Sequence, residues 1–454
     1  MSNSVQTRQS EQDKKSFDMT VGPIKSKMVR FAIPIFIGNL FQQLYNAVDS
    51  LVVGNFVGST ALAAVSSTGT LIYLLVGFFY GIAMGAGVVI AHYIGAKDAR
   101  NASLAVHTTV AVGIIASIIL TVFGVLATPT LLRWMDTPDD VMPEAVIYLR
   151  IYFAGITGLV MYNIFVGIMQ AAGDSRHPLY YLIFSSCLNI VLDLLFIVGF
   201  GAGVAGAAIA TVISQVTSAI LLLIRLTRTT EIYGVKLREI RIDKAMAGSI
   251  IQIGIPSGVQ NSAHALSNVV IQFYINGYGS AAMAGLGAYA KVEGFAMLPL
   301  NSFAMAITTF TSQNLGAKEK DRVDRGIRFG LLGGIIVNQA IGLVLFVFCP
   351  QLLAMFDSTP DVIAYGVGRC RVATPFFFLF AYTQLMSSVL RGCGHATEPM
   401  AVFIVCWCVM RILIMAIGSS ITDSIALIYW VYPVTWLLSS IVLALLWKKV
   451  KKTI

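Results

Sequence analysis

The sequence is poor in charged residues, which make up only 12% of its 454 positions, whereas soluble domains carry roughly 25%. Hydrophobic residues account for 57%. This composition excludes an ordinary soluble domain and predicts a polytopic membrane protein. The chain also lacks a glycine-rich phosphate loop before Lys-Ser or Lys-Thr, and it lacks a nucleophile–base arrangement. The first absence disfavours an ATP-driven pump, and the second disfavours an enzyme.

Metal-ligand spacing is missing as well. The six Cys and five His follow no such pattern. The basic excess, 31 Lys and Arg against 22 Asp and Glu, does not alternate with aromatic residues as in nucleic-acid-binding patches. We therefore expect no cofactor, no metal centre other than a possible Na⁺ site, and no nucleic-acid partner. Residues 1–28 are polar without a short apolar core, which predicts a disordered cytoplasmic tail and no cleaved signal.

What the sequence does contain is long apolar runs. A spanning helix needs about 20 such residues. Loops rich in Lys and Arg alternate with loops almost free of them. The positive-inside rule therefore predicts a protein of the plasma (inner) membrane with both termini in the cytoplasm. Twelve stretches meet the length criterion: 29–55, 62–93, 104–127, 143–170, 179–199, 203–226, 249–276, 283–312, 327–348, 362–389, 399–419 and 424–447.

The sequence repeats itself at a shift of 221 or 222 positions. Pro34 in an Ala-Ile-Pro motif returns as Pro256, and the Gly-Ala-Lys motif at Gly95 returns at Gly316. Because six helices is an even number, both halves enter the membrane in the same direction. The fold class is therefore an all-α membrane protein with twelve transmembrane helices in two parallel repeats around a central cleft. We assign an N-lobe over 29–227, a cytoplasmic linker over 228–248, a C-lobe over 249–447 and a basic cytoplasmic tail over 448–454.

Two acids lie deep inside predicted spans of the first half. An acid at the centre of a membrane helix costs about 2.5–3.5 kcal/mol on insertion scales, which favours a functional role for Asp49 in the first span. The repeat places Ile271 opposite Asp49, so the acid occurs in one half only. Asp193 lies in the fifth span with Asn189 one turn before it. Burial disfavours a bare carboxylate, so Asp49 and Asp193 together predict a site that shares a proton or binds Na⁺.

Other residues of the spans suggest a bend, a cavity and close packing. Pro34 removes a backbone donor and predicts a hinge in the first helix. Polar side chains at helical spacing predict either interhelical hydrogen bonds or the lining of a central substrate cavity: Gln42, Asn46, Gln260, His264, Asn268 and Gln272. Glu293, with Lys291 nearby, suits a structural or gating pair or a site for a substrate cation, and Arg411 can neutralise one of the acids. Three glycines, Gly81, Gly85 and Gly87, predict close helix packing.

Taken together, these motifs resemble the multidrug and toxic compound extrusion (MATE) transporters, in particular the prokaryotic DinF-like branch. The resemblance rests on the first-helix pattern, the Gly-Ala-Lys loops, the Gly-Asp-Ser-Arg-His-Pro loop and Leu-Asn-Ile-Val-Leu-Asp in the fifth span. It implies export of organic, often cationic, compounds by antiport with H⁺ or Na⁺ through alternating access. It also implies an ion site made of Asp49, Tyr45, Asn189, Asp193, Thr211 and Asn163. The seventh and tenth spans lack the acids of the NorM-like branch, which favours coupling in the N-lobe.

The sequence therefore predicts a secondary active multidrug exporter that works as a monomer in the bilayer. Two alternatives stay open at this point. A flippase for lipid-linked oligosaccharides, from the same wider superfamily, is expected to have a more cationic central cavity. An integral membrane enzyme or a non-transporting sensor is the alternative from a different class.

Overall fold

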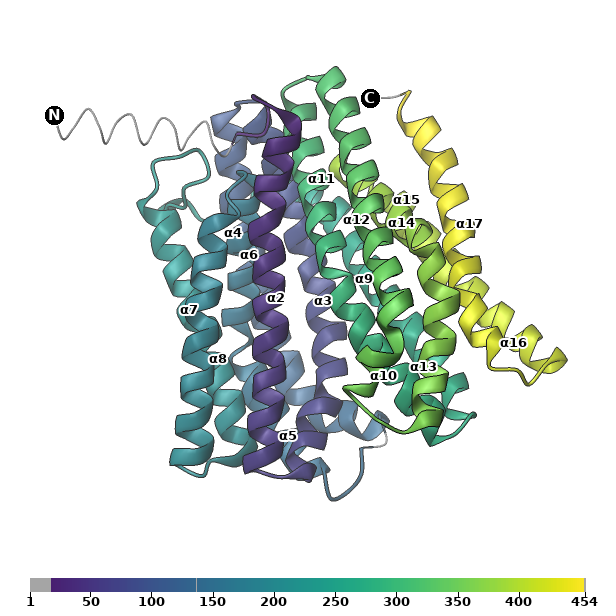
Figure 1. Ribbon diagram of the computed structural model, residues 1–454. Helices are drawn as coiled ribbons and strands as arrows, with labels where there is room; N and C mark the ends of the chain where they lie inside the picture. Colours follow the sequence, from purple (N-terminus) through teal and green to yellow (C-terminus); the bar gives the residue numbers. More distant parts are fainter. Residues whose placement is uncertain (1–17, 136, 453–454) are drawn as a thin grey trace. The chain divides into compact units, whose positions relative to one another are not determined.

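The computed structural model describes residues 18–135 and 137–452, and every regular element within these ranges is helical (Figure 1). The first half contains α2 (Ile24–Phe56), α3 (Ser59–Gly95), α4 (Ala99–Trp134), α5 (Met142–Ala154), α6 (Ile156–Ala171), α7 (Arg176–Asp193), the π-helical turn Leu194–Gly199 and α8 (Gly203–Arg228). The second half contains α9 (Lys244–Asn276), α10 (Ser280–Ala296), α11 (Leu298–Gly316), α12 (Lys320–Ala354), α13 (Pro360–Ala373), α14 (Phe377–Gly392), α15 (Thr397–Val402), the π-helical turn Phe403–Val409, α16 (Met410–Ile421) and α17 (Ala426–Val450).

Each of the twelve predicted spans corresponds to one helix or to consecutive helical segments. Within the described residues, eight helices are by themselves long and apolar enough to cross a membrane, and α5 with α6 meets the same criterion as a bent pair. Helices α2 and α9 fall outside this set, and these two carry the polar stripes found in the sequence. The chain is a multi-pass, all-α membrane protein.

Three predicted spans are interrupted, which the sequence analysis did not anticipate. Helices α5 and α6 meet at Gly155 with a bend of 48°. A Cβ atom on Gly155 would lie 2.2 Å from the side chain of Val212 on α8, so this turn tolerates glycine alone. Pro299 in the first turn of α11 and Pro375 in the 3₁₀ turn between α13 and α14 lie at the other two breaks. Proline lacks the amide hydrogen that would continue a helix.

The two halves repeat each other in backbone conformation and in packing. Helix α3 packs against α4 and α6 as α11 packs against α12 and α14. Three pairs of loop residues, each 221 positions apart, share a positive φ: Gly58 and Gly279 (125° and 90°), Lys97 and Lys318 (55° and 61°), and Gly173 and Gly394 (87° and 86°). A positive φ is uncommon for lysine, so its occurrence at Lys97 and Lys318 is strong evidence for the repeat.

Packing divides the chain into two compact units whose borders lie inside α2 and α9. The first unit contains Ile37–Gly258, and the second contains Met19–Phe36 and the chain from Val259 onward. The linker over 228–248 and the start of α9 thus pack in the first unit, whereas the start of α2 packs in the second. Each border follows within three residues of a helix proline, Pro34 or Pro256. The packing borders therefore differ from the lobe boundaries drawn from the sequence repeat.

The segment before α2 is ordered from Met19. Its amide donates to Oε1 of Gln313 over 3.1 Å, and the Arg322 guanidinium donates to the carbonyl oxygens of Met19 and Gly22 over 2.9 and 2.7 Å. Met19 and Met28 are buried. The prediction of a disordered tail is therefore wrong for residues 19–28, because α11 and α12 supply polar partners for its backbone. Residues 1–17 lie outside the described residues.

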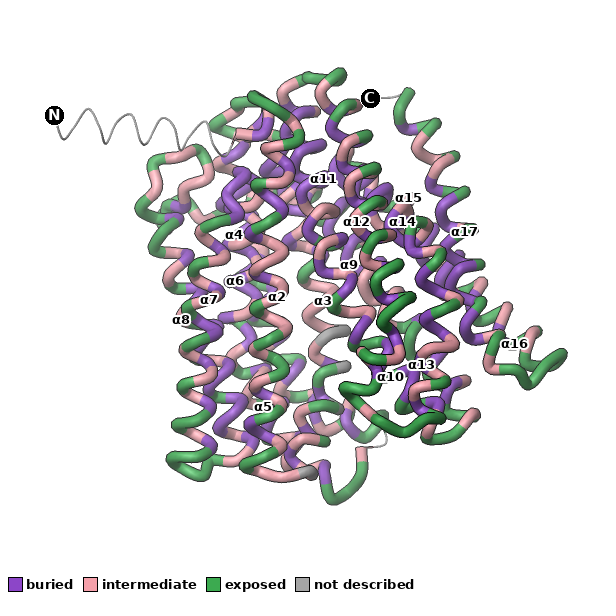
Figure 2. Tube along the Cα trace, in the orientation of Figure 1, coloured by how far each residue is buried: buried purple, intermediate pink, exposed green. Residues whose placement is uncertain are grey.

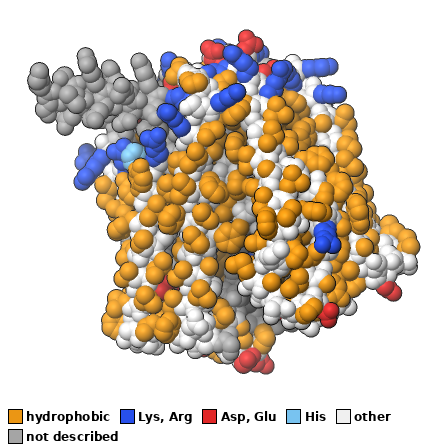
Figure 3. Space-filling model, viewed as in Figure 1, with side chains coloured by type: hydrophobic (Ala, Val, Ile, Leu, Met, Phe, Trp, Pro, Cys, Tyr) orange, Lys and Arg blue, Asp and Glu red, His pale blue; other side chains and the backbone are white. Residues whose placement is uncertain are grey.

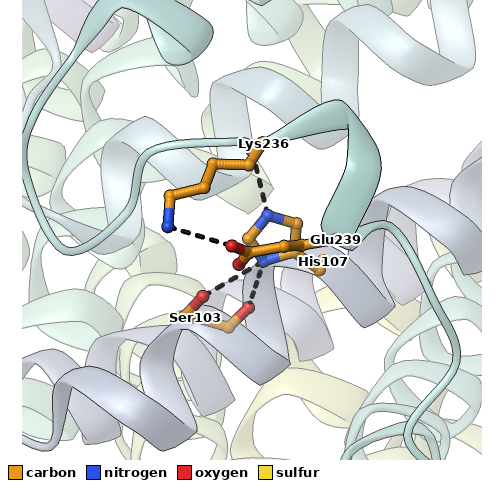
Figure 4. Close-up of polar contacts among 4 residues, drawn as sticks. All are labelled: Ser103, His107, Lys236 and Glu239. Carbon is orange, nitrogen blue, oxygen red and sulfur yellow. Dashed lines mark hydrogen bonds and ion pairs between the residues drawn. The ribbon is translucent and has the colours of Figure 1, made fainter.

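The linker between α8 and α9 is held against α4 (Figure 4). The amide of Lys236 donates to Nε2 of His107 over 2.9 Å, and Nδ1 of the same ring lies 2.7 Å from the Ser103 carbonyl oxygen. Because a carbonyl only accepts, these contacts assign the proton to Nδ1. The amide of Asp243 donates to the Thr108 hydroxyl over 3.1 Å. The sequence interpretation of this segment as a simple connection missed these contacts, which make it part of the first unit.

Glycines let α3 and the start of α9 approach each other within the first unit. A Cβ on Gly81 would lie 2.1 Å from the amide nitrogen of Gly258, and a Cβ on Gly85 would lie 2.4 Å from that of Gly254. Both distances are too short for any side chain. Close packing is therefore confirmed for these two predicted glycines, whereas Gly87 would gain only an ordinary contact at 3.7 Å.

Apolar side chains cover the outer faces of the helices. Figure 2 shows exposed positions along the outside of α12, where Leu332, Ile336, Leu343 and Val347 are all more than half exposed. In Figure 3, Lys and Arg gather at the end of the second unit where α12 begins, and the visible flank below is largely hydrophobic. A lipid environment explains both the apolar flank and the basic end.

We expect Gly81→Ala to lower the free energy of unfolding by about 1–3 kcal/mol, because the added methyl group overlaps the backbone of α9. Thermal unfolding of the purified protein in detergent measures this. Gly77→Ala, on the same helix, is the matched control, since a Cβ at Gly77 meets no atom within 4 Å. Equal stability of the two variants would contradict the crossing described above.

We expect His107→Ala to release the linker, because the Lys236 amide then loses its acceptor. If the free energy that holds the linker against α4 falls by about 1 kcal/mol, the fraction of molecules with a released linker rises about fivefold. Limited trypsin digestion reports this as faster cleavage after Lys236, Arg238 and Arg241. Glu239→Gln is the control, since the exposed Lys236–Glu239 pair contributes little. The interpretation fails if the His107 and Glu239 variants are cut at the same rate.

Candidate functional site

The two intramembrane acids of the first half come together within the first unit. Asp49 lies in the second half of α2, and Asp193 is the last residue of α7. Both are buried, with exposed fractions of 9% and 0%, and their carboxyl groups interact directly with each other. Val52 and Val53, one turn after Asp49, pack in the same hydrophobic cluster as Ile197. Apolar packing thus holds the two helices in the register that pairs the acids.

Several buried polar atoms at this site have no hydrogen-bond partner in the protein. Oδ1 of Asp49, both carboxylate oxygens of Asp193 and both amide atoms of Asn189 are buried without a hydrogen-bond partner. Two facing carboxylates are both acceptors, so a hydrogen bond between Asp49 and Asp193 requires a shared proton. Unpaired buried carboxylates are costly. The site therefore has the chemistry to hold a proton or a small cation.

Tyrosines surround the acid pair. Tyr45 on α2 interacts electrostatically with both acids and lies near Gln215 on α8. Tyr148 on α5 also interacts with both acids, and its ring stacks on Tyr152 with centroids 6.3 Å apart. Sequence analysis missed Tyr148, Tyr152 and Gln215. The sequence did contain a signal for these residues. Tyr148 and Tyr152 are four residues apart, as are Thr211 and Gln215, and this spacing places each pair on one face of a helix.

The remaining two predicted members of the ion site lie on α8 and α6. Thr211 is buried on α8, one turn before Gln215. Asn163 is half-buried on α6 and donates from its amide to the Leu159 carbonyl oxygen over 2.9 Å, within its own helix. The structure thus assembles Asp49, Asp193 and Tyr45, with Asn189 one turn before Asp193. A role for Asn163 stays a prediction.

Asp193 lies where the fifth span changes its helical geometry. The π-helical turn Leu194–Gly199 begins directly after it. A π turn widens the helix by one residue and often marks a functional site. The fifth span of the second half also contains a π-helical turn, Phe403–Val409, which lies earlier in its span and ends two residues before Arg411. No pattern in the sequence predicted either turn.

The residues predicted to line a substrate cavity fall into two groups. Two of them have partners inside the protein, which suits packing: Gln260 accepts from Arg391 over 3.1 Å, and the His264 ring lies 5.2 Å from that of Trp407. Gln272 is exposed and donates to Asn276 on its own helix over 2.9 Å. The others are Gln42, which is half-buried, and Asn46 and Asn268, which are exposed. Contact of any of the six with substrate stays a prediction.

Glu293 pairs with an arginine that sequence analysis did not single out as its partner. Its carboxylate lies 3.0 Å from the Arg369 guanidinium, and both side chains are largely buried. Lys291, the expected neighbour, is exposed and lies over the Phe356 ring at 5.8 Å. Two roles were predicted for Glu293, and the structure supplies a partner for one of them, the ion pair. Arg411 makes no ion pair with an acid in the described part of the chain.

Metal ligands do not cluster elsewhere in the described residues. No group of three or more His, Cys, Asp or Glu there is placed to hold a metal ion. The two acids with Asn189 offer only oxygen ligands and one amide. Such a set suits a proton or a hard monovalent cation, because carboxylate and carbonyl oxygens are hard ligands.

Sequence comparison finds related transporters. The MatE family matches residues 34–195 and 256–417, once in each half. The chain is 28% identical over 434 residues to the probable multidrug resistance protein YoeA of Bacillus subtilis, covering 93% of this chain and 94% of YoeA. It is 26% identical over 394 residues to the probable multidrug resistance protein NorM of Thermotoga maritima, covering 85% and 84% of the two chains.

Structure comparison gives the same fold. A solved structure described as the outward-facing conformation of a multidrug resistance MATE family transporter of the MOP superfamily superposes with a TM-score of 0.91. It covers 97% of this chain and 98% of its own at 23% identity. The likeness extends over nearly all of both chains, so the duplicated helical layout is that of a known transporter fold.

We expect Glu293→Gln to lower the free energy of unfolding by about 2–3 kcal/mol, because Arg369 is then left buried without its carboxylate. A double variant that also carries Arg369→Gln should recover part of this loss. Asp324→Asn, which breaks the exposed pair with Lys451, is the control and should cost below about 1 kcal/mol. Additive losses in the double variant would show that the pair is not coupled.

Proposed function

Since this chain belongs to the MatE family of membrane transporters, we propose that it is a multidrug exporter that exchanges its substrates for H⁺ or Na⁺. It is a transporter and not an enzyme. Multidrug efflux is supported by the names of the two relatives, and the coupling ion is inferred from the acid pair in the first unit. Organic, often cationic, compounds are the proposed substrates.

The observation that carries the proposal is the pair of buried carboxylates without donors, Asp49 and Asp193. Two negative charges repel each other in a poorly solvated site, so a proton or Na⁺ bound between them stabilises the closed pair. When the cation leaves, the repulsion favours separation of the two helices. Asn189 and Tyr45 supply further polar groups beside Asp193 and Asp49.

Helix α2 is the element through which we infer that the ion acts. Asp49 lies in the part of α2 that packs in the first unit, whereas Pro34 lies in the part that packs in the second. A proline leaves the helix without one backbone hydrogen bond, which makes bending easier there. A change at Asp49 can therefore alter the bend near Pro34 and so connect ion binding to alternating access.

Membrane orientation and substrate contacts complete the proposal. The arrangement of Lys and Arg favours a plasma membrane protein with both termini in the cytoplasm. Three residues predicted to line the cavity have no side-chain partner among the contacts described above. We propose that these three, Gln42, Asn46 and Asn268, contact substrate. The protein is proposed to work as a monomer.

A flippase for lipid-linked oligosaccharides is the second candidate. The observation that favours it is the presence of three buried arginines, Arg369, Arg391 and Arg411, in the second unit. Transport of a small dye, driven by an ion gradient, distinguishes an exporter from a flippase, since a flippase would require a lipid-linked substrate.

We expect Asp49→Asn to reduce ion-driven efflux of ethidium at least about fivefold, as the loss of a coupling free energy of about 1–3 kcal/mol implies. The assay uses proteoliposomes with a pH gradient and a Na⁺ gradient imposed separately. Wild-type protein should respond to one gradient, which identifies the ion.

Asp140→Asn is the control, because Asp140 is an exposed acid in the loop between α4 and α5. Its efflux should equal that of wild type. Coupling at Asp49 is ruled out if the Asp49 variant transports as fast as wild type under both gradients.

A further inference from the structure

One cluster of the second unit contains two buried guanidinium groups, those of Arg369 and Arg411, and one carboxylate, that of Glu293. Arg369 and Arg411 have exposed fractions of 6% and 1%. Glu293 interacts electrostatically with both, but its hydrogen-bonded ion pair is with Arg369. The cluster thus carries one positive charge more than it neutralises. Burying an uncompensated charge is strongly unfavourable, so this excess requires an explanation.

Arg411 is surrounded by neutral groups. It donates to the Ser267 hydroxyl over 2.9 Å and to the Thr435 hydroxyl over 3.2 Å. Its guanidinium carbon lies 4.8 Å from the ring centroid of Trp407 and 4.6 Å from that of Tyr432. These contacts use two of the five N–H groups that arginine offers. Ring faces attract a cation weakly and do not cancel its charge.

The position of Arg411 makes an organic cation an unsuitable ligand. The Tyr432 ring is shared between both arginines, since the Arg369 guanidinium carbon lies 4.2 Å from its centroid. A second cation would therefore meet two guanidinium groups and a single carboxylate already engaged with Arg369. A monovalent anion would instead bring the cluster to neutrality.

The internal repeat places the arginine cluster at positions related to those around the acid pair. A shift of 221 positions relates Tyr148, beside the acid pair, to Arg369. A shift of 222 relates Asn189 to Arg411 and Tyr45 to Ser267. The positions equivalent to Asp49 and Asp193 hold Ile271 and Met415, so the second unit carries no acid there. Guanidinium groups instead replace a tyrosine and an amide, and the resulting positive charge calls for an anion.

We propose that the second unit binds a monovalent anionic group at Arg411, beside the hydroxyl groups of Ser267 and Thr435. The shared chemistry is one negative charge that accepts hydrogen bonds from the guanidinium. Its source is either a small inorganic anion such as chloride or the carboxylate of an organic molecule. This site is separate from the acid pair and goes beyond the proposed function.

The test measures thermal unfolding of the full-length protein in detergent at constant Na⁺ and ionic strength. Sodium gluconate is replaced stepwise by sodium chloride in one arm and by sodium benzoate in another. Binding to the folded state should raise the wild-type Tm by about 2–4 °C at anion concentrations well above Kd. A rise with chloride alone identifies an inorganic anion, and a rise with benzoate alone identifies an organic carboxylate.

Arg411→Gln should abolish the anion-dependent rise in Tm, and Arg371→Gln, which alters an exposed arginine of α13, should keep it. Thr435→Val retains the positive charge of Arg411 but removes one of its hydrogen-bond acceptors, so it should weaken the rise in Tm. This second variant provides the test if the Arg411 variant does not fold. The proposal is overturned if neither anion shifts the wild-type Tm, or if the Arg411 variant responds as wild type does. Because the readout requires no transport, a failure of the exporter hypothesis leaves this result interpretable.

Discussion

Compensation of buried charge is the constraint on which this structure depends. In a protein whose outer surface faces lipid, an acid or a guanidinium group inside the helix bundle needs a counter-charge, hydrogen-bond donors or acceptors, or a ligand. Glu293 and Arg369 meet this requirement within the protein. Asp49, Asp193 and Arg411 do not, since the acids lack donors and the arginine contacts only neutral groups. These three residues are where we propose that a ligand supplies the compensation.

Duplication explains how one fold can hold both kinds of incomplete site. The two halves share loop conformations and helix packing, so equivalent positions offer similar space. After duplication each half is free to change the side chains in that space. In the first unit Tyr148 and Asn189 occupy positions where the second unit has Arg369 and Arg411, and the acids Asp49 and Asp193 have no charged equivalents in the second unit. The asymmetry lets the halves perform different tasks with one architecture.

The sequence was sufficient for the helices and for the acids, but not for their partners. Apolar runs of about 20 residues and the internal repeat are strong local signals, and they located all twelve spans. Asp49 and Asp193 were evident because charge is rare in such runs. Tyr148 and Arg369 were not, since their roles depend on which helices meet in space. The docking of residues 19–28 was also missed, because a polar segment without a hydrophobic period resembles a tail until its partners are known.

The start of α2 packs in the second unit and the start of α9 packs in the first, and this arrangement has a consequence for how the protein is made. Met19–Phe36 is synthesised early, yet the groups that receive it, such as Gln313 and Arg322, are synthesised about 300 residues later. The start of α2 must therefore wait in the membrane while the first unit and most of the second are inserted. Completion of the second unit also secures the beginning of the chain, so an interrupted translation product cannot reach the native packing of its own first helix.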